Sequence, residues 1–250
     1  MRRHVTIILV AWAVASTATI AVILGLPVLP AVASREGQVS DTAFITLLVL
    51  SVPVFFFVHA VLLYSGWRFR ATSAGGDGPP IAGNRALETG WVLVSLALVV
   101  GLAIYGWRGM DEMRADPAAH GGHVAAAAGQ ETGELRVRVI GRQFAWAFEY
   151  PDLGVKSVEL RLPKDRLVRF EITSLDVLHS FWIPAFRVKQ DAVPGRTITL
   201  LVTPTEIGRY HADCAALCGA GHTVMTSPVE VMEPRAFDDW VAKQRAAAVR

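Results

Sequence analysis

The sequence contains very little cysteine, with only two among its 250 residues. Two cysteines cannot form the disulfide framework of a small secreted domain, so they form one disulfide or belong to one metal site. Charged residues are also scarce, at 18% of the chain, and the formal net charge is only +2. No basic run with interleaved aromatic residues occurs, which excludes nucleic acid as a partner. The motif CxxCH is missing as well, so the chain carries no covalently attached haem.

What the first half of the chain has in excess is uncharged apolar sequence, in three runs at residues 5–29, 42–67 and 89–107. Each run is long enough to cross the hydrocarbon core of a bilayer, which needs about 20 residues. Residues 1–34 are predicted to be a signal peptide or an N-terminal membrane anchor. The small residues of Pro30–Ser34 are spaced like a signal-peptidase site, which favours a cleaved signal. Residues 35–110 are predicted to form a two-helix transmembrane hairpin.

The arginines predict the orientation of these runs. Arg2 and Arg3 precede the first run, and three more arginines separate the second run from the third. The positive-inside rule then places the N-terminus and the loop between the second and third runs in the cytoplasm. Everything after Trp107 is predicted to lie on the outer face of a bacterial cell membrane. A thiolate metal site on that face does not have to survive the cytosolic thiol pool.

From residue 134 onward, apolar residues recur with a period of two, as in the stretch Leu135–Val139. Several short alternating runs of this kind, separated by proline and glycine, predict an all-β sandwich or barrel over residues 134–234. The alanine- and glycine-rich stretch 111–133 is predicted to be a linker. Residues 235–250 are predicted to close the chain as an amphipathic helix or tail.

Soft metal ligands are concentrated in one short stretch of this second half. It holds Cys214, Cys218, His222 and Met225, and His179 lies upstream. Thiolate, imidazole and thioether ligands together select copper over hard cations. The cluster falls between two late predicted strands, with one histidine from an earlier loop, which is the ligand topology of a cupredoxin. The predicted fold class is therefore a membrane helical hairpin plus an all-β cupredoxin-like sandwich.

The spacing of the two cysteines bears on the kind of copper site. A mononuclear blue-copper site needs only one cysteine. Cys214 and Cys218 are separated by three residues, and a turn of that length aims both sulfurs at one point, where each thiolate can bridge two metals. A structural disulfide between them is the alternative, which His179, His222 and Met225 disfavour.

At these motifs the chain resembles subunit II of haem–copper cytochrome c oxidases. That family carries His-Ser-Phe-Trp-x-Pro and Cys-x-x-x-Cys-Gly-x-x-His-x-x-Met, which stand here as His179–Pro184 and Cys214–Met225, and Lys189–Arg196 also matches. The resemblance implies a dinuclear CuA centre with two copper ions. In that centre two thiolates bridge both coppers, and each copper is completed by one histidine and one weaker ligand. The residues implied are Cys214 and Cys218 as bridges, His179 with Met225 on one copper, and His222 with the backbone carbonyl of Ala216 on the other.

The same resemblance implies a function and partners. The chain is expected to be the electron-entry subunit of a respiratory oxidase, taking electrons from cytochrome c and passing them to haem in subunit I. Oxygen reduction and proton pumping are expected in that other subunit. The implied partners are oxidase subunit I, and with it subunit III, together with cytochrome c and membrane lipid.

Two positions depart from the family pattern. The family commonly has a glutamate between the cysteines, whose side chain reaches a magnesium ion at the boundary with subunit I. Ala216 stands there instead, so the copper ligand carbonyl is kept and the magnesium ligand is not carried over. Phe144 stands where the family often has its electron-entry tryptophan. The residues predicted for electron entry and donor docking are Phe144, Trp146, Asp176 and Asp191, with core packing as the alternative for Trp146.

Two other functions compete with this interpretation. A membrane-anchored copper chaperone has its cysteines early in a thioredoxin-like domain, whereas here they come late, after several predicted strands. A quinol-oxidase-type subunit II shares the hairpin and the β domain but lacks the copper ligands, whereas all five side-chain ligands are present here.

Overall fold

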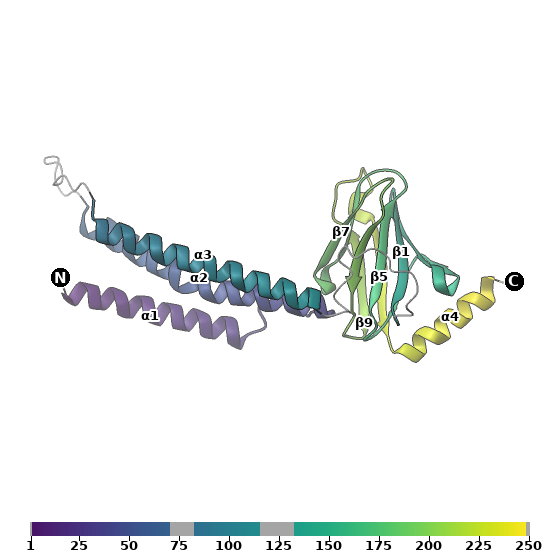
Figure 1. Cartoon of the computed structure of the whole chain (residues 1–250), viewed down its shortest axis with the longest axis horizontal. Helices are drawn as coiled ribbons and strands as arrows, with labels where there is room; N and C mark the ends of the chain where they lie inside the picture. Colours follow the sequence, from purple (N-terminus) through teal and green to yellow (C-terminus); the bar gives the residue numbers. More distant parts are fainter. Residues whose placement is uncertain (1, 71–82, 116–132, 249–250) are drawn as a thin grey trace. The chain divides into compact units, whose positions relative to one another are not determined.

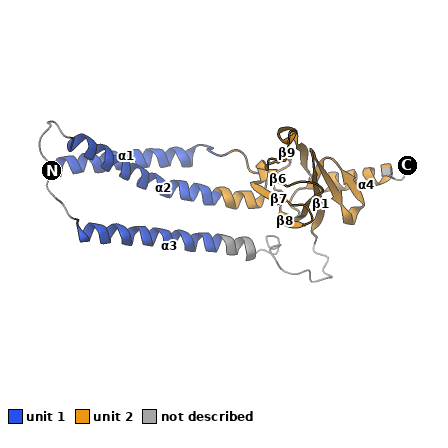
Figure 2. Cartoon of the chain, turned by 90° about the horizontal axis from the view of Figure 1, so that it is seen from above, with its two compact units in different colours: residues 1–29, 42–109 blue, residues 30–41, 110–250 orange. Residues whose placement is uncertain are grey.

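The computed structural model describes residues 2–70, 83–115 and 133–248 (Figure 1). Contacts divide the chain into two compact units, coloured separately in Figure 2. The helical unit comprises residues 1–29 and 42–109, and the β unit comprises residues 30–41 and 110–250. Most of the predicted linker, at residues 116–132, lies outside the described residues, as does the glycine- and proline-rich connector at 71–82.

Three long helices carry the apolar runs: α1 (Arg2–Gly25), α2 (Arg35–Arg68) and α3 (Arg85–Ala115). All three are long and apolar enough to cross a membrane. The start of α3 is fixed by a cap that the sequence encodes. The Asn84 carboxamide oxygen accepts hydrogen bonds from the backbone N–H groups of Ala86 and Leu87, and the Glu88 carboxylate accepts one from the Asn84 N–H. These contacts satisfy donors that a helix N-terminus otherwise leaves open.

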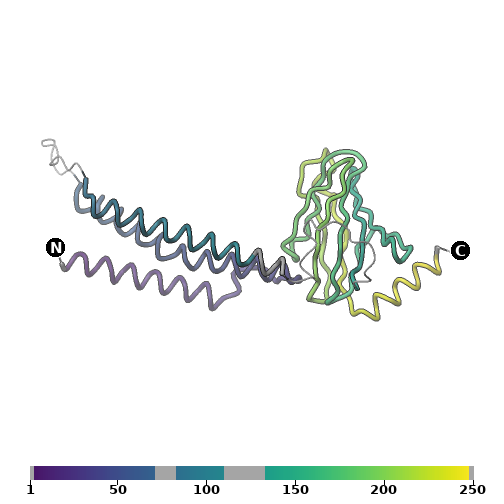
Figure 3. The backbone as a smooth tube through the Cα atoms, in the orientation of Figure 1, coloured from purple at the N-terminus to yellow at the C-terminus, as the bar shows by residue number. Residues whose placement is uncertain are grey.

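The described part of the β unit is built from two five-stranded sheets, in the orders β3-β2-β1-β5-β8 and β4-β10-β9-β6-β7. Most neighbours are antiparallel, but β1 pairs with β5 and β4 with β10 in parallel. The smooth trace of Figure 3 follows these strands. The bounds are β1 (Leu135–Arg142), β2 (Ala145–Tyr150), β3 (Val155–Ser157), β4 (Leu160–Pro163), β5 (Val168–Ser174), β6 (His179–Ile183), β7 (Val188–Ala192), β8 (Ile198–Val202), β9 (Gly208–Cys214) and β10 (Thr226–Met232).

The core of the sandwich follows from the period-two pattern. In β1 and β5 alternate residues are buried, because successive side chains of a strand point to opposite faces. Aromatic rings fill the space between the sheets, and Phe181 lies edge-on to Trp146, Phe148 and Phe170. Such contacts stabilise a core beyond the area that the rings bury. The predicted fold class, apolar helices followed by an all-β sandwich, is confirmed.

Helix α4 (Pro234–Ala248) closes the β unit. Phe237, Trp240 and Val241 form its buried face, and the rings of Phe237 and Trp240 pack against Tyr150 at the end of β2. The spacing of these three residues puts them on one side of a helix. The structure thus has a helix with one buried apolar face over most of the stretch 235–250, where a helix or tail is predicted.

Candidate metal centre

The predicted ligands come from two places in the β unit. His179 is the first residue of β6, and Cys214 is the last residue of β9. Phe181 of β6 pairs with Cys214 of β9. The start of β6, which carries His179, therefore lies beside the end of β9, which carries Cys214. The remaining ligands lie in the loop that joins β9 to β10, which includes the short helix η3 (His222–Val224).

This ligand loop is held in shape by backbone hydrogen bonds across its base. The Cys214 N–H donates to the Met225 carbonyl (3.0 Å), and the Met225 N–H donates to the His222 carbonyl (3.3 Å). The Ala215 N–H donates to the Ser180 carbonyl of β6 (2.8 Å), which ties the loop to the strand that carries His179. The loop is therefore bonded at its base to both neighbouring strands.

The donor atoms converge. The two cysteine Sγ atoms lie 3.8 Å apart, Cys214 Sγ lies 3.8 Å from His179 Nδ1, and Cys218 Sγ lies 3.8 Å from His222 Nδ1. Met225 Sδ lies 3.9 Å from Cys218 Sγ, and the Ala216 carbonyl oxygen lies 3.3 Å from Cys214 Sγ. The structure thus brings together all five predicted side-chain donors and the predicted carbonyl.

These distances fit a metal shell. Ligands bound at about 2.0–2.3 Å around a tetrahedral metal lie roughly 3.3–3.8 Å from one another. Both cysteines are free thiols, and their sulfurs are much farther apart than the roughly 2.05 Å of a disulfide. The chemistry of the donors, with two thiols, two imidazoles and a thioether, also matches soft-metal preference. The residues present therefore fit copper.

Burial isolates most of the cluster from solvent. His179 and Met225 are almost completely buried, Cys214 and Cys218 are buried, and His222 is partly exposed. Burial, reinforced by the neighbouring Cys214 thiol, raises the pKa of Cys218 to about 11. Because metals bind the thiolate form, the cluster exchanges protons for metal when it is loaded.

Asp176 fixes the direction of the His179 ring. Its carboxylate lies 2.8 Å from His179 Nε2 and also accepts the backbone N–H groups of Gln143 (2.7 Å) and Val177 (2.6 Å). Burial would raise the pKa of Asp176, but these hydrogen bonds outweigh it and hold the pKa well below its usual range. An ionised carboxylate only accepts, so His179 Nε2 carries the ring proton and Nδ1 presents its lone pair to the cluster.

The predicted electron-entry residues have different surroundings. Phe144 is 37% exposed, and its ring lies against the ligand loop, so closely that a Cβ added at Gly221 would lie 2.5 Å from it. Trp146 is buried and lies edge-on to the His179 ring, with centroids 5.9 Å apart. Asp191 is exposed on β7, opposite Ser180.

Two residues that support the cluster carry no ligand atom and were missed by sequence reasoning about ligands. The Gln143 side-chain amide donates to the Cys218 carbonyl (2.6 Å), which braces the ligand loop. Gly141 leaves room for rings, because a Cβ there would lie 2.9 Å from Trp146 and 3.2 Å from His179. Both lie more than 70 residues before the ligand loop in the sequence. Only Gly141 gives a local signal, because a glycine inside a strand often marks a place where another group packs closely against the backbone.

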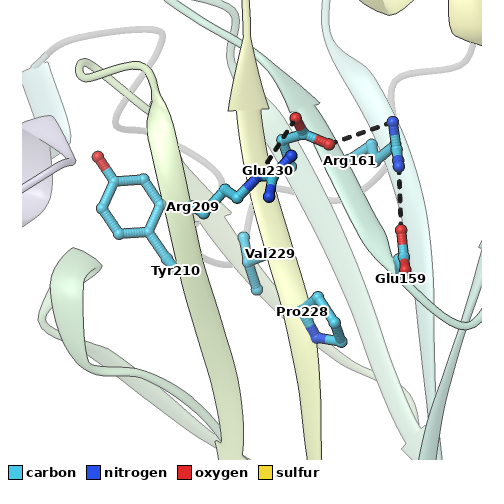
Figure 4. A pocket seen from close by; sticks show the side chains of 7 residues that line it. All are labelled: Glu159, Arg161, Arg209, Tyr210, Pro228, Val229 and Glu230. Atoms are coloured by element: carbon cyan, nitrogen blue, oxygen red, sulfur yellow. Dashed lines mark hydrogen bonds and ion pairs between the residues drawn. The ribbon is translucent and has the colours of Figure 1, made fainter.

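A surface pocket of about 280 Å³ lies elsewhere on the β unit (Figure 4). Its charged residues are already paired, with Arg161 bonded to Glu230 (3.1 Å) and Glu159 (3.0 Å). It includes Arg209 at the start of β9 and Glu230 near the end of β10, far along both strands from Cys214. It adds no group to the metal centre.

Comparison with known proteins identifies the family of this chain. Residues 155–232 match the family model for the cytochrome c oxidase subunit II periplasmic domain. Cytochrome c oxidase subunit 2 of Synechocystis sp. is 35% identical over 253 residues, which cover 88% of this chain and 76% of that protein. The chain belongs to the cytochrome c oxidase subunit 2 family. The subunit 2 of Thermostichus vulcanus is 32% identical over 260 residues, covering 88% of this chain and 79% of the relative.

Among solved structures, the periplasmic domain of subunit II of cytochrome oxidase from Bradyrhizobium japonicum is 28% identical, with a TM-score of 0.44. It covers 45% of this chain and 94% of that domain. Membership of the family makes the chain a component of an oxidoreductase complex. The apolar helices indicate membrane insertion, and the periplasmic description of the family model places the matched β domain on the outer face.

Proposed function

We propose that this chain is the electron-entry subunit of its oxidase, with a dinuclear copper centre that accepts electrons from cytochrome c. Haem in subunit I receives these electrons, and oxygen reduction there is coupled to proton pumping. The observation that carries the proposal is the convergence of five side-chain donors and the Ala216 carbonyl, each 3.3–3.9 Å from a cysteine sulfur.

Each ligand has an assigned place in this proposal. The thiolates of Cys214 and Cys218 would be shared by both copper ions, His179 and Met225 would complete the ligands of one ion, and His222 with the Ala216 carbonyl would complete those of the other. When bound, such a thiolate-bridged pair of coppers supplies a one-electron store whose geometry changes little between redox states. The chain contributes rigidity, because the ligand loop is bonded to β6 and braced by Gln143.

Phe144 is the proposed point of electron entry. Its ring is partly exposed and contacts the segment Gly219–Gly221, which joins Cys218 to His222. A donor that touches this ring is therefore separated from the cluster by one side chain and the ligand loop. Trp146 is buried beside His179, which supports a packing role. The Asp176 carboxylate is hydrogen-bonded to groups of the protein itself. Asp191 is therefore the better placed of the two carboxylates to attract a basic electron donor.

The proposed partners are oxidase subunits I and III, cytochrome c and membrane lipid. Ala216 has no side-chain carboxylate, so this position offers no side-chain ligand to a magnesium ion at the boundary with subunit I. A magnesium ion there would need other residues as its ligands.

The test is copper loading of the full chain in detergent, followed by metal analysis and absorption spectroscopy. We expect two coppers per chain and the purple mixed-valence bands of a thiolate-bridged pair. Cys218→Ser removes one bridge and should abolish those bands. Leu217→Ala is the matched control, because Leu217 lies between the cysteines but its side chain is 86% exposed. A wild-type chain that stays metal-free, or an unchanged spectrum in Cys218→Ser, would refute the proposal.

A further inference from the structure

The segment Pro30–Ser34, whose small residues are spaced like a signal-peptidase site, is built into the β unit. The Ala33 N–H donates to the Ala185 carbonyl (2.8 Å), and the Thr205 N–H donates to the Ala33 carbonyl (2.9 Å). Ser34 forms an antiparallel bridge with Pro204. Ala33 is 2% exposed and Ser34 is completely buried. The peptide bond that a peptidase would cut therefore lies inside the folded domain.

Arg187 holds the chain on both sides of that peptide bond. Its guanidinium donates to the Pro30 carbonyl (2.7 Å), upstream of the bond. It also makes two hydrogen bonds to the Asp41 carboxylate (2.8 and 3.1 Å), downstream of the bond. Paired charge-assisted hydrogen bonds of this kind are among the stronger polar contacts in proteins. The β unit thus binds residues 30–41 as one continuous piece.

Ser34 also caps α2. Its hydroxyl accepts the Gly37 N–H (2.9 Å) and donates to the Phe186 carbonyl (2.9 Å). Cleavage after Ala33 would place a charged α-amino group at this buried position. An ammonium group is unfavourable there for two reasons: burial removes its hydration, and a helix N-terminus already carries partial positive charge.

Within the helical unit, α1 has a specific partner in α2. The Trp12 indole N–H donates to the Pro53 carbonyl (2.7 Å), and the Trp12 ring lies edge-on to Phe57. Ser16 of α1 and Val52 of α2 are both 6% exposed. Small residues and hydrogen bonds between helices are what stabilise helix pairs in a membrane. A signal peptide that is removed has no need of such a contact.

We infer that α1 is a permanent third membrane helix packed on α2, and that Ala31-Val32-Ala33 is a structural segment of the β unit and not a processing site. The charges agree with three spans. Arg2 and Arg3 hold the start of α1 in the cytoplasm, so α1 ends on the outer face, where residues 30–34 meet the β domain.

Two leucine substitutions separate retention from processing. Signal peptidase needs small residues at both Ala31 and Ala33 of an A-x-A site, but only Ala33 is buried, whereas Ala31 is exposed. The experiment purifies the full chain from membranes as wild type, Ala31→Leu and Ala33→Leu. It measures intact mass and thermal unfolding for each.

If α1 is permanent, wild type and Ala31→Leu both retain α1 and unfold at the same temperature. Ala33→Leu also retains α1, but overpacking lowers its unfolding temperature by about 5 °C or more. A wild-type chain that begins at Ser34, or anywhere after Trp12, overturns the inference. A longer chain in Ala31→Leu than in wild type overturns it as well. If Ala33→Leu does not fold, the masses of the other two chains still decide.

Discussion

Single residues around the cluster orient the His179 ring and brace the ligand loop. Asp176 holds the His179 ring by its Nε2 atom, and the Gln143 amide holds the Cys218 carbonyl. Gly141 keeps open the space that the His179 ring occupies. Loss of a partner of this kind typically lowers metal affinity or activity by about 10–100-fold. The centre is thus a property of strands β1 and β6 as well as of the ligand loop.

The ligand residues could be predicted from sequence because soft donors at close spacing are rare in a chain with so little sulfur. The supporting residues could not be predicted in the same way. Gly141 and Gln143 act only because β1 ends beside the ligand loop, and that proximity is created by folding. The sequence predicts Asp176 as a residue for donor docking. In the structure its carboxylate contacts the His179 ring, a contact that was not predicted from the sequence.

At Met225 the expected effect is on the reduction potential. Its thioether is buried and lies 3.9 Å from Cys218 Sγ. Met225→Leu keeps the volume but removes a weak donor, so copper content should stay at two per chain while the potential rises by tens of millivolts or more. Redox titration of the absorption bands measures the shift.

Met232→Leu is the control for this substitution. Met232 is also buried, but it lies at the end of β10 and contributes no atom to the cluster. The reduction potential of Met232→Leu should equal that of the wild-type protein. Complete loss of copper from Met225→Leu would contradict the minor ligand role given to the thioether.

Among the secondary-structure elements, the strands could be predicted because burial alternates along them. Their pairing could not, since the parallel pairs β1–β5 and β4–β10 join strands that are distant in sequence. Periodicity also gives no sign of Pro30–Ser34, because that segment meets the β unit through backbone hydrogen bonds and one bridge. A segment held by its backbone leaves almost no pattern in its side chains.

Tyr150 links β2, β4 and α4, and it predicts how stability depends on alkaline pH. Its hydroxyl accepts the Arg161 N–H (2.8 Å) and donates to the Arg161 carbonyl (2.9 Å). Burial raises the pKa of Tyr150 well above its usual value, and the Arg161 hydrogen bond offsets this only in part. The unfolded chain therefore loses this proton first, so the stability is complete below about pH 10 and falls as pH rises further.

Tyr150→Phe should show both effects in thermal unfolding between pH 7 and pH 11. At pH 7 the variant loses about 1–3 kcal/mol, because the Arg161 N–H and carbonyl lose a partner in a buried place. Above pH 10 its stability should fall less steeply than that of wild type, because the titrating hydroxyl is gone. Parallel pH profiles for the two proteins would contradict this prediction, because they would mean that the pKa of Tyr150 is the same in the folded and the unfolded chain.

For the whole molecule, the two compact units do not follow the order of the sequence. The β unit takes in residues 30–41, so the outer end of α2 is part of the same contact network as the sandwich. Composition separates apolar runs from globular sequence, and family membership then places the β domain outside. Neither composition nor family membership indicates that the start of α2 is bonded to Arg187 and to the Thr203 backbone.

The proposed electron entry at Phe144 can be tested in the whole assembly. Phe144→Ala removes a partly exposed ring that lies on the ligand loop, so a donor docked there loses both its apolar contact and the ring that joins it to this loop. We expect at least a tenfold slower oxidation of reduced cytochrome c by the purified complex in stopped-flow measurements, with unchanged copper content and absorption bands.

Trp182→Ala is the matched control, because Trp182 is an aromatic residue of almost equal exposure, 38% against 37%, that lies within β6 and not on the ligand loop. Its rate should remain close to that of wild type. Phe144→Trp should retain rapid oxidation, because an indole also covers the loop and adds an N–H donor. Equal loss of rate in Phe144→Ala and Trp182→Ala would place the docking area across the outer face of β6. No loss in either would move electron entry away from Phe144 altogether, to a part of the surface that reaches the cluster through the partly exposed His222.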